Sequence, residues 1–291
     1  MVNKVNFLGH EVTRLIVGDN PMNGHSYIED SITGLEMKKY YTAERIKATF
    51  KHIEEQGING MLPLADPYIT RLLWEYQNEG GNLKLIWQPY PPIGMDRSIR
   101  IIPKSLDTIG SYHQGTTTDL LFEEQDFDTI KENLKKMHET GKPVGLGTHY
   151  PEIIERSEEE GWEVDFYVAC LQNARRGREG EESGFITGKE KQGFVFYPED
   201  RPIMLNTLRK VNKPIVAFKI FAGGQMFEGK DENGVKEAIK GAYDEVFSAL
   251  KPDDIAAIGV FQRDKDQIKQ NIEIYNEWYN EKYNNSYGIL N

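Results

Sequence analysis

The sequence predicts a single (β/α)₈ barrel that occupies residues 1–291 as one domain. Short apolar runs alternate with amphipathic segments along the chain, and eight such units can be counted. A length of 291 residues is typical of one barrel of this kind. No linker-like segment interrupts the alternation. An open, doubly wound sheet is the weaker alternative, because such sheets usually contain fewer units.

The clearest unit runs from Val144 to Asn173. Val144–Thr148 is a short apolar run that predicts a buried strand, and Pro151 stands where the first turn of a helix tolerates proline. Gly161 ends that helix, and Val164–Leu171 predicts a second buried strand. Strand, helix and strand in this order form a right-handed unit with parallel strands. The polar residues that follow both strands should therefore face a common site.

The other elements follow in order along the chain. The remaining strands are expected at 15–18, 59–65, 83–88, 108–113, 215–221 and 255–260. The remaining helices are expected at 42–56, after Pro67, from about 97, and at 127–140, 198–210, 234–250 and 265–282. Residues 173–192 are charged and rich in glycine. Such a stretch predicts a lid over the barrel mouth or a segment without regular structure.

Composition excludes several classes of function. The formal net charge is -11 and the sequence pI is about 5.2, which argues against binding to nucleic acid or to an anionic membrane surface. We find no apolar run of membrane-spanning length and no signal-peptide pattern. The single cysteine, Cys170, excludes intramolecular disulfides and fits a reducing cytoplasm. We expect a cytoplasmic protein with a small-molecule ligand, and the sequence does not indicate its oligomeric state.

Two histidines and the cysteine fall at the ends of three consecutive strands, as His113, His149 and Cys170. Neighbouring parallel strands lie about 4.8 Å apart, so we expect His113 and His149 to converge on one ligand. With Cys170 they form a candidate site for zinc, iron or manganese. Alternatively, the histidines are an acid–base pair or bind a substrate hydroxyl, and Cys170 is a small buried hydrophobe.

Lys219 interrupts an otherwise apolar strand, VAFKIF. A buried lysine is costly unless it is paired, so its side chain should point into the polar mouth of the barrel. Loss of solvent could lower its pKa enough for Schiff-base or general-base catalysis. The alternative is an ion pair with a carboxylate such as Asp66, which ends the second strand.

Polar residues near the ends of other strands are candidates for binding a sugar-like substrate. Three of them lie in the loop after the first strand, and two more lie at the ends of the third and sixth strands: Asp19, Asn20, His25, Gln88 and Gln172. Ordinary turn hydrogen bonds are the alternative. The AGGQ turn, with Gly223 and Gly224, could hold a phosphate through backbone N–H groups, and simple turn geometry is the alternative there.

Four segments in the correct order resemble the aldo/keto reductase superfamily across nearly the whole chain. They are GIN at 57–59, VGLGTHYPEIIE at 144–155, IVAFKIFAGGQM at 215–226 and IGVFQRDKDQIKQNIEIYNE at 258–277. The patterns THxPE and GWxVDFY are similar to those of a bacterial branch of unassigned reaction. The resemblance implies the barrel fold. It also implies cofactor contacts from Gly223, Gly224 and Asn271, with Arg263 and Lys265 as the only candidates for binding a 2′-phosphate.

The catalytic residues of that family are largely replaced here. The family uses an aspartate, a tyrosine, a lysine and a histidine, and only His113 falls at a matching position. Leu62 stands in place of the aspartate and Gln88 in place of the lysine, while Thr148 and His149 replace the serine and asparagine that hold the nicotinamide. NADP(H) is therefore the less expected cofactor, and we expect weak or absent NADPH binding.

We therefore expect an enzyme of the kind found in carbohydrate metabolism, which acts on a small sugar-like or carbonyl substrate. Isomerase, lyase or aldol-type chemistry, acid–base or metal-assisted, would use His113, His149, Asp66 and Lys219. The alternatives are an NADP(H)-dependent oxidoreductase that has rebuilt its proton donor, and a ligand-binding barrel without catalysis.

Overall fold

Eight parallel strands close into a barrel in the computed structural model, which describes residues 1–102, 106–172 and 196–284. The strands are β3 (Leu15–Gly18), β4 (Gly60–Leu62) continued by β5 (Leu64–Ala65), β6 (Lys84–Pro89), β7 (Thr108–His113), β8 (Val144–Thr148), β9 (Phe166–Cys170), β10 (Ile215–Phe218) and β11 (Ile255–Gly259). They pair in chain order, and β11 returns to pair with β3. The predicted (β/α)₈ barrel is thereby confirmed. The lid predicted at 173–192 lies outside the described residues.

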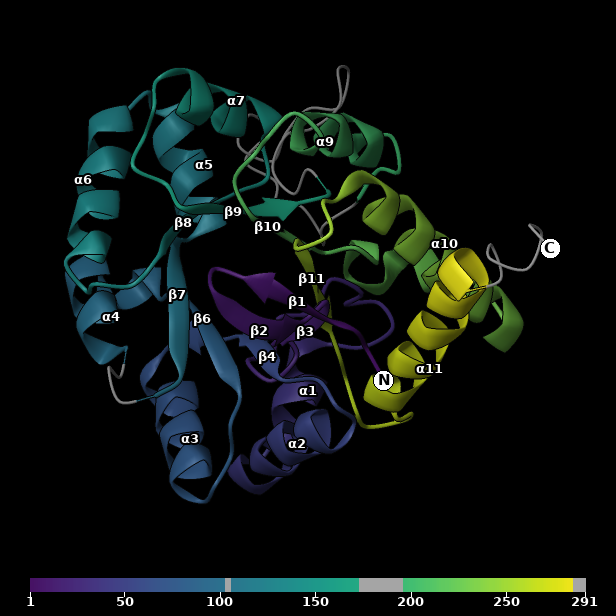
Figure 1. The fold of residues 1–291 in the computed structure, drawn as a ribbon. Helices are drawn as coiled ribbons and strands as arrows, with labels where there is room; N and C mark the ends of the chain where they lie inside the picture. Colours follow the sequence, from purple (N-terminus) through teal and green to yellow (C-terminus); the bar gives the residue numbers. More distant parts are fainter. Residues whose placement is uncertain (103–105, 173–195, 285–291) are drawn as a thin grey trace.

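The helices form an outer ring around the strands (Figure 1). They are α1 (Gly34–Tyr40), α2 (Ala43–Glu55), α3 (Pro67–Asn78), α4 (Met95–Ile101), α5 (Gly115–Glu123), α6 (Phe127–His138), α7 (Pro151–Glu159), α9 (Asp200–Leu208), α10 (Glu232–Ala249) and α11 (Gln267–Tyr279). Shorter helical turns are Pro91–Ile93, Ala222–Phe227 and Asn280–Asn284. None of the helices in the described part of the chain is long and apolar enough to cross a membrane.

An N-terminal hairpin, β1 (Lys4–Phe7) and β2 (His10–Thr13), was not predicted from the sequence. Its Phe7 is fully buried and belongs to the cluster inside the barrel, where its ring packs against Phe166 with centroids 5.9 Å apart. Phe166 begins β9, so the hairpin closes the N-terminal end of the barrel. The opposite end, where the strands finish, is left for the site.

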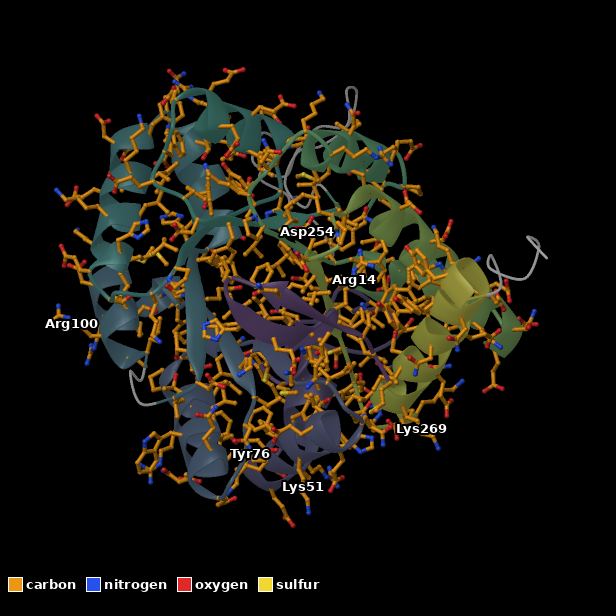
Figure 2. The ribbon with its side chains drawn as sticks, in the orientation of Figure 1. Arg14, Lys51, Tyr76, Arg100, Asp254 and Lys269 are labelled. Carbon is orange, nitrogen blue, oxygen red and sulfur yellow. The ribbon has the colours of Figure 1, made fainter. Side chains whose placement is uncertain are left out.

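Buried polar groups, in addition to apolar ones, hold the wall of the barrel in place. Asp254, before β11, accepts hydrogen bonds from the N–H of Ile215 at 2.9 Å and of Lys251 at 2.8 Å. The Arg14 guanidinium, before β3, donates to the carbonyl of Lys251 at 3.2 Å. Figure 2 shows Arg14 and Asp254 within the molecule, whereas Lys51 lies at its edge. These bonds fix the start of β10 and β11, whose C-terminal ends carry the site.

Candidate functional site

A cavity of about 390 Å³ opens where the barrel strands end. Asp19, Tyr112 and Lys219 line its inner part, near the barrel axis. The cavity then continues past the turn Ala222–Phe227 to Asn271 on α11, which lines its outer part. Its lining residues thus come from the strand ends and from the loops after β10 and β11.

Lys219 directly follows β10 and lines this cavity. Its backbone φ is +54°, a left-handed conformation that is strained for any residue but glycine. Its Nζ lies 3.0 Å from His149 Nε2 and 4.8 Å from the centre of the Tyr27 ring. Burial alone would lower the pKa of Lys219, but Tyr27, Cys170 and Asp119 more than offset this and raise it above its ordinary value. The lysine is thus held as an ammonium in the mouth, and the lowered pKa expected for a Schiff base is wrong.

His149 connects Lys219 to a buried carboxylate. Its Nδ1 lies 2.6 Å from Asp119 Oδ2 on α5, and Asp119 also accepts hydrogen bonds from Thr148 Oγ1 at 2.6 Å and from the His149 N–H at 3.2 Å. Because Nδ1 faces a carboxylate, it carries the proton, and Nε2 is left to accept from the Lys219 ammonium. Asp119, His149 and Lys219 thus form one hydrogen-bonded chain.

His113 does not belong to this chain, so the expected convergence of His113 and His149 is wrong. His113 lies between β7 and the helices α5 and α6, where Nδ1 is 2.7 Å from Thr118 Oγ1 and Nε2 is 3.2 Å from Asn133 Nδ2. Burial lowers the pKa of His113 to about 4. Both ring nitrogens are engaged, so this histidine is a neutral structural group.

A bulge in β7 explains why His113 was wrongly expected to face the barrel mouth. Leu85 pairs with Thr108, but the next residue of β6, Ile86, pairs with Gly110, so β7 holds one extra residue. An extra residue reverses which side chains point inward. In β7 it turns Tyr112 into the barrel, where its hydroxyl donates to Gln88 Oε1.

The predicted metal site of His113, His149 and Cys170 does not form either. His113 is engaged by Thr118 and Asn133, while Cys170 and His149 are neighbours that line a second cavity. Within residues 1–102, 106–172 and 196–284, no three His, Cys, Asp or Glu side chains gather in a group that could hold a metal ion.

Asp19 ends the first barrel strand with a buried carboxylate. Its Oδ2 accepts hydrogen bonds from the Leu64 N–H at 2.7 Å and from Asn23 Nδ2 at 2.8 Å. Burial outweighs these bonds and raises the pKa of Asp19 to about 7. Three other predicted substrate residues line the same cavity, namely Asn20, His25 and Gln88.

Asp66 and Gln172 are held by local structure. Asp66 caps α3, where its Oδ1 accepts from the backbone N–H groups of Tyr68 and Ile69. The ion pair expected between Asp66 and Lys219 is not formed, because Lys219 contacts His149 instead. Gln172 lines the second cavity; with its amide oxygen toward Arg201, it accepts from Nη1 at 3.1 Å.

Besides Lys265, the family resemblance assigned four residues to cofactor binding, of which three line the first cavity and one is paired with carboxylates. Gly223 and Gly224 line the first cavity with φ of +60° and +102°. Asn271 also lines it, although its amide is used by Tyr243 and by the carbonyl of Gln267, at 2.8 and 2.7 Å. Arg263, in contrast, is paired with Asp264 at 2.9 Å and Glu36 at 3.2 Å.

Two residues of the site were missed from the sequence. Tyr27 packs against the glycine turn: a Cβ added to Gly223 would lie 2.5 Å from the Tyr27 Cβ. The hydroxyl of Tyr27 accepts from Asn20 Nδ2 at 3.2 Å. Nothing marks this tyrosine among the 15 of the sequence. The other is Asp119, which lies on a helix and not at a strand end.

The second cavity has a volume of about 620 Å³ and lies beside the first. Cys170 and His149 line it together with residues of α7 and α9. Lys219 lines the first cavity and His149 lines the second, so the bond between them lies at the boundary of the two.

Comparisons with known proteins show the fold. No protein-family model matches the sequence, and no curated protein matches it. A mutant of Gox0644 in complex with NADPH is similar over 94% of this chain and 88% of its own, with a TM-score of 0.57 and 9% identity. The aldo-keto reductase AKR11C1 from Bacillus halodurans matches over 94% and 91%, with a TM-score of 0.56 and 9% identity. A truncated 3-deoxy-D-arabino-heptulosonate 7-phosphate synthase from Thermotoga maritima matches over 99% and 93%, with a TM-score of 0.51 and 12% identity.

Proposed function

We propose that this protein is an enzyme that transfers a proton next to the carbonyl group of a small, uncharged, polyhydroxylated substrate. Isomerases, lyases and aldolases share this step. The observation that carries the proposal is that Asp19, with a pKa of about 7, and the Lys219 ammonium line the same cavity at the mouth of the barrel.

The two groups have complementary chemistry. A carboxyl group whose pKa is close to neutral is well suited to removing a proton from carbon and returning it. Removal of a proton next to a carbonyl leaves negative charge on the oxygen, and a fixed cation stabilises that charge. Asp19 is therefore assigned as the general base and Lys219 as the group that stabilises the oxyanion.

The remaining residues of the cavity position the substrate and Lys219. His149 and Asp119 hold the ammonium in place through the hydrogen bonds at 3.0 and 2.6 Å. Asn20, Tyr27 and Gln88 line the cavity with groups that bind substrate hydroxyls.

The test is exchange of carbon-bound hydrogen with solvent. A panel of hydroxyaldehydes and hydroxyketones, from trioses to hexoses, is incubated with the protein in D₂O and followed by proton NMR. We expect loss of the signal from the hydrogen next to the carbonyl for at least one compound, and no loss with Asp19→Asn. Absence of exchange across the whole panel contradicts the proposal and leaves the non-catalytic barrel as the better interpretation.

A nicotinamide-dependent oxidoreductase is the second candidate. The lining of the first cavity favours it, because it includes Lys219, the glycine turn and Asn271. Two features oppose it. Leu62 and Gln88 line the cavity where the resemblance would place an aspartate and a lysine, and Arg263 is already paired with carboxylates.

A further inference from the structure

Asp19 and His25 stand at the two ends of one hydrogen-bonded turn at the mouth of the barrel. The carbonyl of Asp19 accepts from the N–H of Asn23 at 3.1 Å, and the carbonyl of Asn20 accepts from the N–H of His25 at 2.9 Å. Gly24 completes the turn with a φ of +73°, a conformation that favours glycine. The backbone of His25 is therefore held in a fixed relation to Asp19.

The imidazole of His25 is available to a ligand. It lines the first cavity together with Asp19 and Lys219, and it is exposed to solvent there. Within the part of the chain that the structure describes, its ring forms no hydrogen bond with another residue. Its partial burial and the charges of Lys38 and Lys219 lower the pKa of His25, and the charge of Asp66 offsets them only in part. The ring is thus neutral near pH 7, with one N–H and one free lone pair.

The proposed chemistry leaves a proton to be moved between two oxygens. Once Asp19 has removed the proton from carbon, the substrate is an enediolate, in which one oxygen carries the negative charge and its neighbour carries a proton. If that proton stays where it is, the substrate can only return to its original form. If it moves to the other oxygen, the carbonyl group changes place. A neutral imidazole can both give and take a proton near neutral pH, so it suits this step.

We propose that His25 moves this proton, so that the enzyme interconverts an aldose and a ketose; the inference rests on the proposed proton transfer by Asp19. Asp19 takes the proton next to the carbonyl, the electrons of that bond form a carbon–carbon double bond, and the π electrons of the carbonyl move to its oxygen. The N–H of His25 gives its proton to this oxygen and takes the proton of the neighbouring hydroxyl in its place. The second oxygen becomes the new carbonyl, while the other carbon takes the proton back from Asp19. No oxidant or reductant is required.

The cations of the cavity favour sugars without phosphate. Lys219 and Lys265 line it, and Lys265 is paired with Glu232 at 2.8 Å. Lys219 is assigned to the oxyanion of the reacting carbonyl. Among the described residues, the lining of the cavity therefore offers a phosphate no further lysine or arginine. Free aldoses and ketoses are the substrate class that this lining fits.

The experiment follows three aldose–ketose pairs in D₂O by NMR: glyceraldehyde with dihydroxyacetone, xylose with xylulose, and glucose with fructose. Two products are measured from each aldose, namely the ketose and the aldose that is deuterated next to its carbonyl. We expect the wild type to form both from at least one aldose. In His25→Gln the ratio of ketose to deuterated aldose should fall about a hundredfold, because glutamine cannot move the proton between the oxygens.

Two further variants frame this result. His138→Gln is the control, because His138 lies on α6 and contacts the carbonyl of Glu163 at 3.0 Å; it should keep the wild-type ratio. Asp19→Asn should lose both products, since it lacks the base that removes the proton from carbon. Circular dichroism verifies that each variant is folded.

The ratio separates the failure of this inference from the failure of the proposed function. Deuterated aldose without ketose in the wild type, or an unchanged ratio in His25→Gln, overturns the role of His25 and leaves the proton transfer by Asp19 in place. Equal loss of both products in His25→Gln also overturns it, because His25 would then act when the proton leaves carbon. Absence of both products in the wild type contradicts the proposed function itself.

Discussion

The Nζ of Lys219 lies 3.0 Å from Nε2 of His149, and this contact joins residues that line two different cavities. Asp119 holds the far side of the imidazole, so Lys219 is fixed by a carboxylate that it does not touch. A left-handed backbone at Lys219, with φ of +54°, places the ammonium there at some cost in strain. Strain of this kind is typical of functional sites, and this relationship gives rise to the first prediction.

Replacement of Lys219 by methionine should reduce the rate of hydrogen exchange by about a hundredfold or more, because a fixed charge at a developing oxyanion contributes about that much. The measurement is the NMR exchange rate with the best compound of the panel. Lys240→Met serves as the control, since Lys240 pairs with Glu281 on the surface. An unchanged rate in Lys219→Met excludes the assigned role.

The glycine turn should be sensitive to a single methyl group. Gly223→Ala places a Cβ 2.5 Å from the Tyr27 Cβ, whereas Gly229→Ala meets nothing within 4 Å at a similar φ of +70°. Both variants bear the cost of a left-handed alanine, and we expect Gly223→Ala to lose about 1–3 kcal/mol more from the clash. Urea unfolding of the two variants measures the difference. Equal stabilities argue that Tyr27 moves aside freely.

Acid should destabilise the protein through His113. Its pKa is about 4 in the folded protein and about 6.5 when it is unfolded, so between these values the unfolded chain binds more protons. Stability from this group is therefore complete above pH 6.5 and is lost as the pH falls to 4, by up to roughly 3 kcal/mol.

The measurement is the free energy of unfolding of wild-type protein and His113→Gln at pH 7 and at pH 4.5. We expect the wild type to lose more stability than the variant on acidification. A constant difference between the two proteins would mean that His113 is protonated equally in the folded and unfolded states, which contradicts a lowered pKa in the folded protein.

NADPH should bind poorly, with a dissociation constant weaker than about 100 μM. The two cations that the family resemblance offers for a 2′-phosphate are already paired: Arg263 with Asp264 and Glu36, and Lys265 with Glu232. The net charge of -11 repels an anionic cofactor further. Fluorescence of NADPH titrated with protein measures the affinity. Binding in the low micromolar range would support the oxidoreductase.

The alternation of strand and helix patterns was enough to predict the barrel, because each unit buries its own apolar face. Finer features depended on contacts distant in sequence. The bulge in β7 arises from its pairing with β6, and no local pattern reveals that it turns His113 away from the mouth. The position of Asp119 could not be predicted from a local pattern either, because it lies on α5 and only the folding of the chain brings it next to His149.

Lys219 was easier to place because a charge within an apolar strand has few acceptable positions. Its contact could not be predicted in the same way. The sequence suggested Asp66, but Asp66 is used as the cap of α3, and His149 contacts the ammonium. Sequence reasoning thus located the mouth of the barrel and several of its residues. It did not predict which side chains would touch.

The role of Asp19 as the general base is the central claim, and the pH dependence of hydrogen exchange tests it most directly. Burial raises the pKa of Asp19 to about 7, and only its ionised form can accept a proton from carbon. The exchange rate of the wild type should therefore rise as the pH increases through about 7 and level off above it, while Asp19→Asn should show no such rise. An exchange rate in Asp19→Asn that equals the wild-type rate, with the same dependence on pH, would contradict this role.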